Sequence, residues 1–326
     1  MKMKRKWIWT AIVAGSVSLG LIWGQFSGNQ IDRDAVAAAE KTFGIQIESQ
    51  MVLVDDVWLH VVSAGPADGK PVFLLHGYPE FWYAWRGPME VLASAGFRVI
   101  VPDQRGYNKS DKPSNVEDYR LDELAGDVVG LADAFGYEKI FLAGHDFGGL
   151  VSWWTLMLHP DRISKFSIVN KPHPYARTEE ATGDETISWY RTFLRIPWLP
   201  GYVARVGNWA LLAKNLRATS QPGTFPDADL DQFRSAWDRD GAIHTMGAWY
   251  RANADFDLKH LDGRIAVPSL IMLAPDDAFS SIERGRRSSL FLQDGQVLEL
   301  DAGTHWVIQE HPQVIGDALV DFFSQP

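Results

Sequence analysis

The segment 144–149 reads Gly-His-Asp-Phe-Gly-Gly and carries the most specific chemical signal in the sequence. It lies between an apolar run at 140–143 and a helix-period run at 150–158, the order of strand, sharp turn and helix that presents a catalytic nucleophile. Asp146 stands at the tip of this turn, where a serine hydrolase has its serine. A lone Gly-x-Asp-x-Gly is more often an ordinary turn, but here the glycines allow a strained backbone and close strand-helix packing. We therefore predict that the Asp146 carboxylate is a nucleophile.

A second motif, His-Gly-Tyr-Pro at 76–79, directly follows the apolar run 72–75. In this position the backbone N–H of Tyr78 could pair with that of Phe147 to form an oxyanion hole. Losing one such donor typically costs roughly 10²- to 10³-fold in rate. Without the turn at 144–149, the simpler interpretation would be a tight turn with no catalytic part.

The candidate base and its partner come later in the chain. Asp277 lies just beyond the apolar run 270–273, and His305 follows the last apolar run at 297–300. A histidine can act as general base while a carboxylate fixes its tautomer, and Asp276 competes with Asp277 for that second role. The other histidines lack metal-ligand spacing and are expected to be structural or surface groups; they are His60, His145, His159, His173, His244, His260 and His311.

The scaffold that must position these groups is readable as strands alternating with helices. Between the later strands, helix-period segments such as 119–135 and 150–158 predict a mostly parallel sheet covered on both faces. The first two strands, separated by Asp55 and Asp56, are typical of an antiparallel hairpin at the sheet edge. The predicted strands span 51–54, 58–62, 72–75, 99–101, 140–143, 165–169, 270–273 and 297–300.

The pattern changes between 172 and 261, where helix-period runs rich in tryptophan and tyrosine replace the strands. We expect this insertion to be a helical cap over the carboxyl ends of the strands, where such sheets bind ligands. The predicted division of the chain is an N-terminal signal or anchor (1–28), a connector (29–46), a core first part (47–171), the cap (172–261) and a core second part (262–326).

Together these motifs resemble the epoxide hydrolase branch of the α/β-hydrolase fold family, over a match that runs from 47 to 323. The most specific pieces are 76–80, 103–110, 144–149 and the segment around His305. The resemblance implies an α/β-hydrolase fold with an eight-stranded, mostly parallel sheet, an inserted helical cap, and no cofactor or metal.

The resemblance also implies two cap tyrosines that point at the nucleophile. The segments Trp-Tyr-Arg at 189–191 and Trp-Tyr-Arg-Ala-Asn at 249–253 match the family's pattern, so these roles are carried over to Tyr190 and Tyr250. From the residues alone, either tyrosine would more readily be a packing residue with a polar tip.

A carboxylate nucleophile restricts the reaction. Acyl transfer to it would give an anhydride, whereas attack on a saturated carbon gives an ordinary ester, so the substrate should be an alkylating electrophile. The resemblance implies an epoxide, opened through an ester on Asp146 and hydrolysed by water to a vicinal diol. We expect a small lipophilic epoxide, because tryptophans suggest an apolar pocket; they are Trp82, Trp85, Trp189, Trp198 and Trp249.

Two rival functions stay open at this point. One is a dehalogenase with the same nucleophile. A haloacid enzyme should carry arginines where Phe147 and Leu150 stand, and a haloalkane enzyme should carry a halide-binding asparagine where Tyr78 stands. The other rival is a non-catalytic ligand-binding protein on the same fold.

Composition bounds the class of protein. The chain has 326 residues, of which 46% are apolar and 22% charged, as in a globular α/β domain with an insertion. Its net charge is -10, and beyond the first six residues it carries 27 basic against 41 acidic groups, which argues against nucleic acid as a partner. With no cysteine, a disulfide and a thiolate nucleophile are excluded.

The N-terminus has the layout of a targeting segment. Four basic residues within the first six positions precede an uncharged, mostly apolar stretch at 7–23, typical of a secretory signal or a single-pass anchor. Spanning a bilayer takes roughly 17 to 25 residues. The nearest small-residue cleavage pattern, at 35–37, lies well beyond the stretch and favours an anchor. We expect the catalytic domain to be exported or membrane-anchored, outside the cytoplasm.

Overall fold

Eight strands form one sheet in the order β1-β2-β4-β3-β5-β6-β7-β8. From β4 to β8 along this order all neighbours pair in parallel, whereas β2 pairs antiparallel with both β1 and β4. The predicted eight-stranded, mostly parallel sheet is therefore confirmed. The strands are β1 (Ile47–Val54), β2 (Val57–Ala64), β3 (Pro71–Leu75), β4 (Arg98–Pro102), β5 (Ile140–His145), β6 (Ile163–Val169), β7 (Ser269–Leu273) and β8 (Gly295–Glu299). The computed structural model describes residues 35–42, 44–176, 188–254, 258 and 261–326, without the side chains of 188–190.

The edge hairpin of β1 and β2 is longer than predicted. Its register pairs Val54 with Val57 across a two-residue turn and continues until Ile47 lies opposite Ala64. Asp55 has a φ of 50°, the left-handed conformation that such turns require and that aspartate tolerates. The extra residues at 48–50 are polar and exposed, so an apolar pattern could not reveal them.

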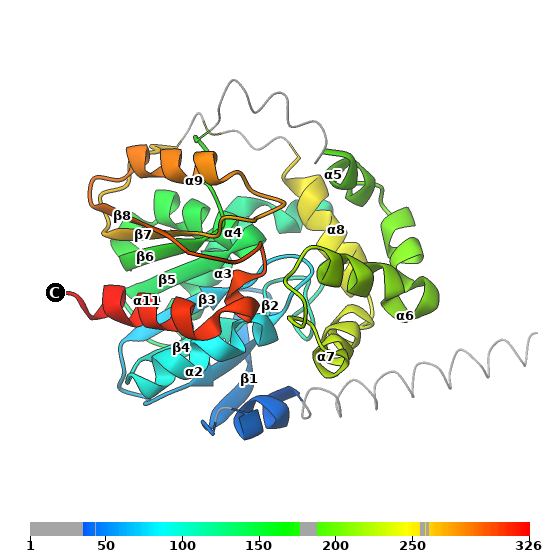
Figure 1. Ribbon diagram of the computed structural model, residues 1–326, viewed down its shortest axis with the longest axis horizontal. Helices are drawn as coiled ribbons and strands as arrows, with labels where there is room; N and C mark the ends of the chain where they lie inside the picture. Colours follow the sequence, from blue (N-terminus) through cyan, green and yellow to red (C-terminus); the bar gives the residue numbers. More distant parts are fainter. Residues whose placement is uncertain (1–34, 43, 177–187, 255–257, 259–260) are drawn as a thin grey trace, which may run out of the picture.

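Helices cover both faces of the sheet, as parallel strands require. On one face α2 (Arg86–Ser94) packs against α11 (Pro312–Ser324), and on the other α3 (Leu121–Ala134) packs against α4 (Asp146–Leu158) (Figure 1). Every residue of β5 and β7 is consequently buried. The short helices of the core are η1 (Trp82–Trp85), η2 (Val116–Tyr119), η3 (Pro160–Arg162), α9 (Ile282–Ser288), η6 (Ser289–Phe291) and α10 (Val307–Glu310).

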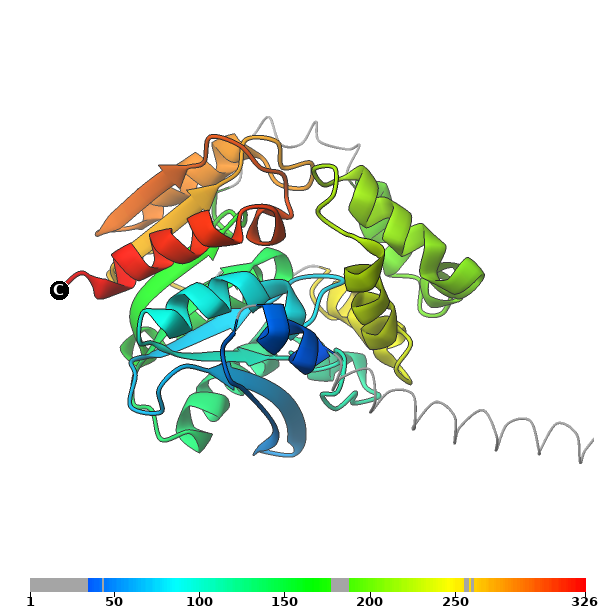
Figure 2. The ribbon, with the colours of Figure 1, turned by 60° about the horizontal axis from the view of Figure 1, so that its bottom comes forward.

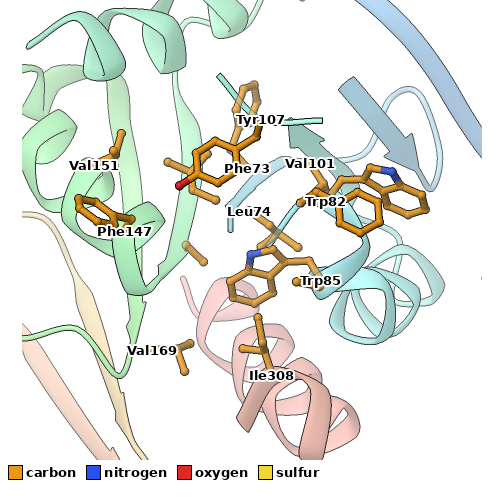
Figure 3. Close-up of a cluster of buried hydrophobic side chains, with 14 of the residues drawn as sticks. Phe73, Leu74, Trp82, Trp85, Val101, Tyr107, Phe147, Val151, Val169 and Ile308 are labelled. Carbon is orange, nitrogen blue, oxygen red and sulfur yellow. The ribbon is translucent and has the colours of Figure 1, made fainter. Parts of the chain in front are cut away.

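Large buried side chains anchor the loop that follows β3. Trp82 and Trp85 of η1 are fully buried, and Figure 3 shows them beside Leu74 and Val101 of the sheet, with Ile308 of α10 below Trp85. Burying such a side chain contributes roughly 1.5 to 3 kcal/mol. The packing therefore fixes the end of the loop that begins with the motif at 76–79.

The segment between β6 and β7 is helical, and its described residues include no strand. Figures 1 and 2 show its helices grouped beyond one end of the sheet. The indole N–H of Trp237 donates to the Pro79 carbonyl at 2.6 Å, and that of Trp249 donates to the Arg105 carbonyl at 3.0 Å. These bonds attach the helices to the loops that follow β3 and β4. The helices are α5 (Ser188–Leu194), α6 (Leu199–Ala218), α7 (Asp227–Trp237) and α8 (Ala242–Ala252).

The expected signal or anchor at 1–28 lies outside the described residues. Of the helices within the described ranges, none combines the length and apolar character needed to cross a bilayer. Localisation therefore stays a prediction from the sequence.

Candidate active site

Asp146 occupies a strained turn between β5 and α4. β5 ends at His145 and α4 begins at Asp146, which has a φ of 48°; a non-glycine residue held there costs roughly 1 to 3 kcal/mol. Gly148 is required next to it, since a Cβ at that position would lie 2.3 Å from the Leu75 carbonyl oxygen. A Cβ on Gly77 would likewise lie 2.5 Å from the Asp146 Cβ. The turn thus brings the carboxylate against the loop after β3.

The two carboxylate oxygens of Asp146 face different groups. Oδ2 accepts a hydrogen bond from the Tyr78 backbone N–H at 3.0 Å, as an oxyanion-hole donor would supply. Phe147, the other predicted donor, lies in the first turn of α4, where helix N–H groups have no intrahelical acceptor. Oδ1 lies 3.7 Å from His305 Nε2 and 3.4 Å from Lys171 Nζ. The oxygen outside the oxyanion hole is therefore the one that faces the base.

His305 is oriented by Asp277, the acid predicted from the sequence. Its Nδ1 lies 2.8 Å from Asp277 Oδ2, while Asp277 Oδ1 accepts hydrogen bonds from the backbone N–H groups of Phe279 and Ser280 at 2.7 and 2.9 Å. Asp276, the rival, is exposed, and its backbone N–H donates to the Gly303 carbonyl. The structure thus places Asp277, and not Asp276, against the His305 ring.

Charges in the site set the protonation of both groups. Burial alone would raise the pKa of Asp146, but the charges of Lys171, His305 and His145 and the Tyr78 N–H outweigh it and hold that pKa well below its usual range. Burial alone would lower the pKa of His305, but the charge and hydrogen bond of Asp277, with a further contribution from Asp146, raise it. Asp146 is therefore more acidic than an isolated aspartate, and His305 is more easily protonated than an isolated histidine.

Of the two predicted cap tyrosines, the structure places Tyr250 in the site. Its side chain on α8 is buried, and its ring makes edge contacts with the rings of Tyr78 at 5.4 Å and Phe147 at 4.7 Å. Tyr250 therefore sits directly over the two residues proposed as oxyanion donors. Tyr190 belongs to α5, but its side chain lies outside the described residues, so its role stays a prediction.

His145 and Glu80, which belong to the motifs at 144–149 and 76–80, make contacts that the sequence did not predict. Both nitrogens of buried His145 face acceptors: Nε2 lies 2.7 Å from the His305 carbonyl oxygen and Nδ1 lies 3.1 Å from Glu80 Oε2. Glu80 also accepts the Gly77 N–H at 2.8 Å. His145 thus ties the base's backbone to the loop after β3. Both residues stand in the predicted motifs, but the spacing of the motifs in the sequence does not show that their side chains contact each other.

Lys171 was missed altogether, because it belongs to no motif. It follows β6 by two residues, and its backbone carbonyl accepts the Trp153 indole N–H at 3.0 Å. Its Nζ lies 5.5 Å from the centre of the Phe147 ring as well as 3.4 Å from Asp146 Oδ1. Burial lowers the pKa of Lys171 more than the charge of Asp146 raises it, and Arg191 lowers it further.

Within the part of the chain that the structure describes, no cluster of three or more histidine or acidic side chains is arranged to hold a metal ion. Asp146 itself is surrounded by the His305 ring, which Asp277 orients, and by the Tyr78 backbone N–H. Groups of these kinds can perform covalent catalysis.

Comparisons with known proteins agree with this geometry. Residues 70–312 match the family model described as alpha/beta hydrolase fold. The chain is 32% identical to the AB hydrolase superfamily protein YfhM of Bacillus subtilis, over 85% of this chain and 98% of the relative. It is 30% identical to epoxide hydrolase 4 of Homo sapiens, over 82% of this chain and 75% of the relative. The solved structure of epoxide hydrolase A from Mycobacterium thermoresistibile is similar with a TM-score of 0.76 and 27% identity, covering 85% of this chain and 98% of that one. The chain therefore belongs to the α/β-hydrolase fold family, on the branch that holds these epoxide hydrolases.

Proposed function

We propose that this protein is an epoxide hydrolase, which adds water to a lipophilic epoxide and releases a vicinal diol. The observation that carries the proposal is that the two carboxylate oxygens of Asp146 contact different groups. One oxygen accepts the Tyr78 N–H and the other faces His305. A carboxylate held in this way can attack carbon with one oxygen and accept oxyanion charge on the other.

In the first step, Asp146 Oδ1 attacks an epoxide carbon and the carbon–oxygen bond of the ring breaks. The developing alkoxide takes a proton from the hydroxyl groups of Tyr250 and Tyr190, which hydrogen-bond the ring oxygen. The position of Tyr250 over Tyr78 and Phe147 supports this role. The product is an ester between Asp146 and the opened substrate.

In the second step, His305 takes a proton from water, and the hydroxide attacks the carboxyl carbon of the ester. The negative charge then lies on Oδ2, opposite the N–H groups of Tyr78 and Phe147. As it collapses, the bond between the carboxyl carbon and Oδ1 breaks, and the leaving oxygen of the diol takes the proton held by His305. The proton of the new Asp146 carboxylic acid returns through solvent to the tyrosine that gave up its own in the first step. Asp277 holds the His305 ring with Nδ1 as donor, which leaves Nε2 to act as base. The 3.7 Å between Nε2 and Oδ1 is longer than a hydrogen bond, so the histidine is available to water.

Trapping the ester tests the proposal, because the attack needs no base and the hydrolysis does. Changing His305 to Gln removes a contribution typically worth roughly 10²- to 10⁴-fold from the second step. Mixing the H305Q variant with a reactive aryl epoxide should add the full mass of the epoxide, and peptide mapping should place it on Asp146. The exposed His244 gives a matched control, since H244Q should turn over without accumulating ester.

The same experiment separates the rivals. A dehalogenase would form an adduct from an alkyl halide with release of halide, and a passive binding protein would form none. An adduct that persists in the D146N/H305Q double variant, or that maps to another residue, would overturn the assignment of the nucleophile.

A further inference from the structure

Lys171 places a positive charge on the attacking oxygen of the nucleophile. Its Nζ lies 3.4 Å from Asp146 Oδ1, and the Lys171 side chain is 21% exposed. The stem is held in place, because a Cβ added to Gly149 would lie 2.7 Å from the Lys171 Cβ. The lysine is thus part of the site rather than a surface group that happens to reach it.

This contact does not serve the attack itself. An ammonium group 3.4 Å from Oδ1 stabilises the negative charge on that oxygen and so makes it a weaker nucleophile, and Tyr78 already stabilises the other oxygen. Its charge does help to keep Asp146 ionised, because Lys171 lowers the pKa of that carboxyl more than His305 or His145 does.

The charge balance changes once the ester forms. Asp146 then carries no charge, and Lys171 loses its closest anionic partner while it remains largely buried. A buried cation without a partner is strongly destabilising. Arg191 adds positive charge close enough to lower the pKa of Lys171. The ester state is therefore favoured if the substrate supplies a negative charge of its own.

Resting on the epoxide hydrolase activity proposed above, we infer that Lys171 is a specificity-determining residue, and that the substrate is an epoxide with a carboxylate on or next to its ring. The substrate carboxylate takes the place of Asp146 Oδ1 as the anionic partner of Lys171, with Nζ near its present position, and so frees that oxygen for attack. A haloacid enzyme would hold a substrate carboxylate with arginines at the positions where Phe147 and Leu150 stand. The cation instead comes from the end of β6.

Distances decide where the carboxylate must lie. The attacked carbon has to come within about 3 to 3.5 Å of Oδ1, and a carboxylate oxygen must lie about 2.8 Å from Nζ. Because Nζ and Oδ1 are only 3.4 Å apart, both conditions are met when one or two bonds separate the carboxylate carbon from the attacked carbon. Oxirane-2-carboxylates have this geometry, whereas a carboxylate at the end of a long chain does not.

The test compares 3-phenyloxirane-2-carboxylate with its uncharged carboxamide. In the wild-type protein, kcat/KM should favour the carboxylate by roughly 10- to 100-fold, the range for a hydrogen bond to a charged group. Changing Lys171 to Met keeps the stem and should reduce this ratio to near one, while Lys171→Arg should keep most of it. Lys214 on the exposed side of α6 is the matched control, and K214M should keep the wild-type ratio.

Binding of unreactive analogues measures the preference for a carboxylate over a carboxamide without any need for turnover. Calorimetry should show that 2-phenylcyclopropane-1-carboxylate binds the wild type at least about tenfold more tightly than its carboxamide, and K171M should lose this difference. If the wild type opens neither epoxide but still prefers the cyclopropane carboxylate through Lys171, the proposed activity fails, and with it the epoxide substrate, while the carboxylate specificity of Lys171 stands. If the wild type opens the carboxamide as well as the carboxylate, and binds both cyclopropanes equally, this inference fails and the activity stands.

Discussion

His305 Nδ1 lies 2.8 Å from Asp277 Oδ2, whereas the adjacent Asp276 is exposed to solvent. Two neighbouring aspartates therefore provide a matched pair of variants. Changing Asp277 to Asn should lower turnover by up to roughly 10⁴-fold, the loss found when a catalytic histidine is left in the wrong tautomer. Changing Asp276 to Asn should leave turnover within about threefold. Steady-state kinetics with an aryl epoxide measures both, and equal losses in the two variants would contradict the assignment.

The pH dependence should show that the pKa of His305 is raised. Asp277, Asp146 and Glu80 all raise it against the effect of burial, so in the resting protein the ring should titrate above 6.5. Esterification of Asp146 removes one of these charges. The pKa of His305 in the ester intermediate, which sets the pH at which turnover falls on the acid side, should therefore be lower than its pKa in the free protein. Because the base must be neutral, activity falls as the pH drops through that lower pKa. NMR titration of the ring and a pH–rate profile give the two values, and a resting titration below 6.5 would contradict the prediction.

Removing the Tyr250 hydroxyl should slow the first chemical step without unfolding the cap. The ring contacts with Tyr78 and Phe147 are kept in Tyr250→Phe, so only the proton donor is lost. We expect measurable residual turnover, and near-complete loss when Tyr190→Phe is added. Single-turnover kinetics should locate the effect in ester formation. Tyr202, a cap tyrosine that is 71% exposed, is the control, and wild-type rates in the double variant would refute the role.

Alanine variants of Gly77 and Gly126 compare a glycine that packs against Asp146 with one at which an added Cβ contacts nothing. In Gly77→Ala the new Cβ would lie 2.5 Å from the Asp146 Cβ and 2.8 Å from its Oδ2, so the nucleophile must move, and misplacement by about 1 Å can cost about 10²-fold in rate. Gly126 lies within α3 and has nothing within 4 Å of an added Cβ. Gly126→Ala should therefore keep activity and stabilise the protein by about 0.5 to 1 kcal/mol. Thermal unfolding with activity assays measures both, and unchanged turnover in G77A would contradict the crowding at Asp146.

The localisation predicted from the N-terminal sequence is tested by a fusion. We expect the basic residues at 2–6 to stay in the cytoplasm while the chain beyond residue 23 crosses the membrane. A reporter that is active only in the cytoplasm, fused after Pro326, should then be silent. The same reporter on a chain that lacks residues 1–28 should be active, and strong activity with the full chain would overturn the prediction.

The sequence by itself determined the sheet and the place of the nucleophile turn. Buried parallel strands are mostly apolar along their length, and a turn that holds Asp146 at a φ of 48° needs glycines around it. Such constraints act between near neighbours in the chain, so they leave a readable local pattern. The sequence pattern did not predict the polar residues at 48–50 of β1, because a strand exposed at the sheet edge needs no apolar side chains.

Only the tertiary structure decided which side chains meet at Asp146. The choice between Asp276 and Asp277 depends on how one loop turns its side chains, and the contact with Lys171 joins the ends of β5 and β6. Tyr250 reaches the site because tryptophan bonds attach the cap to the loops after β3 and β4. These contacts join residues far apart in the chain, and their energy depends on packing and charge in three dimensions. For that reason Lys171, which belongs to no motif, could be identified only from the fold, in which its Nζ lies 3.4 Å from Asp146 Oδ1.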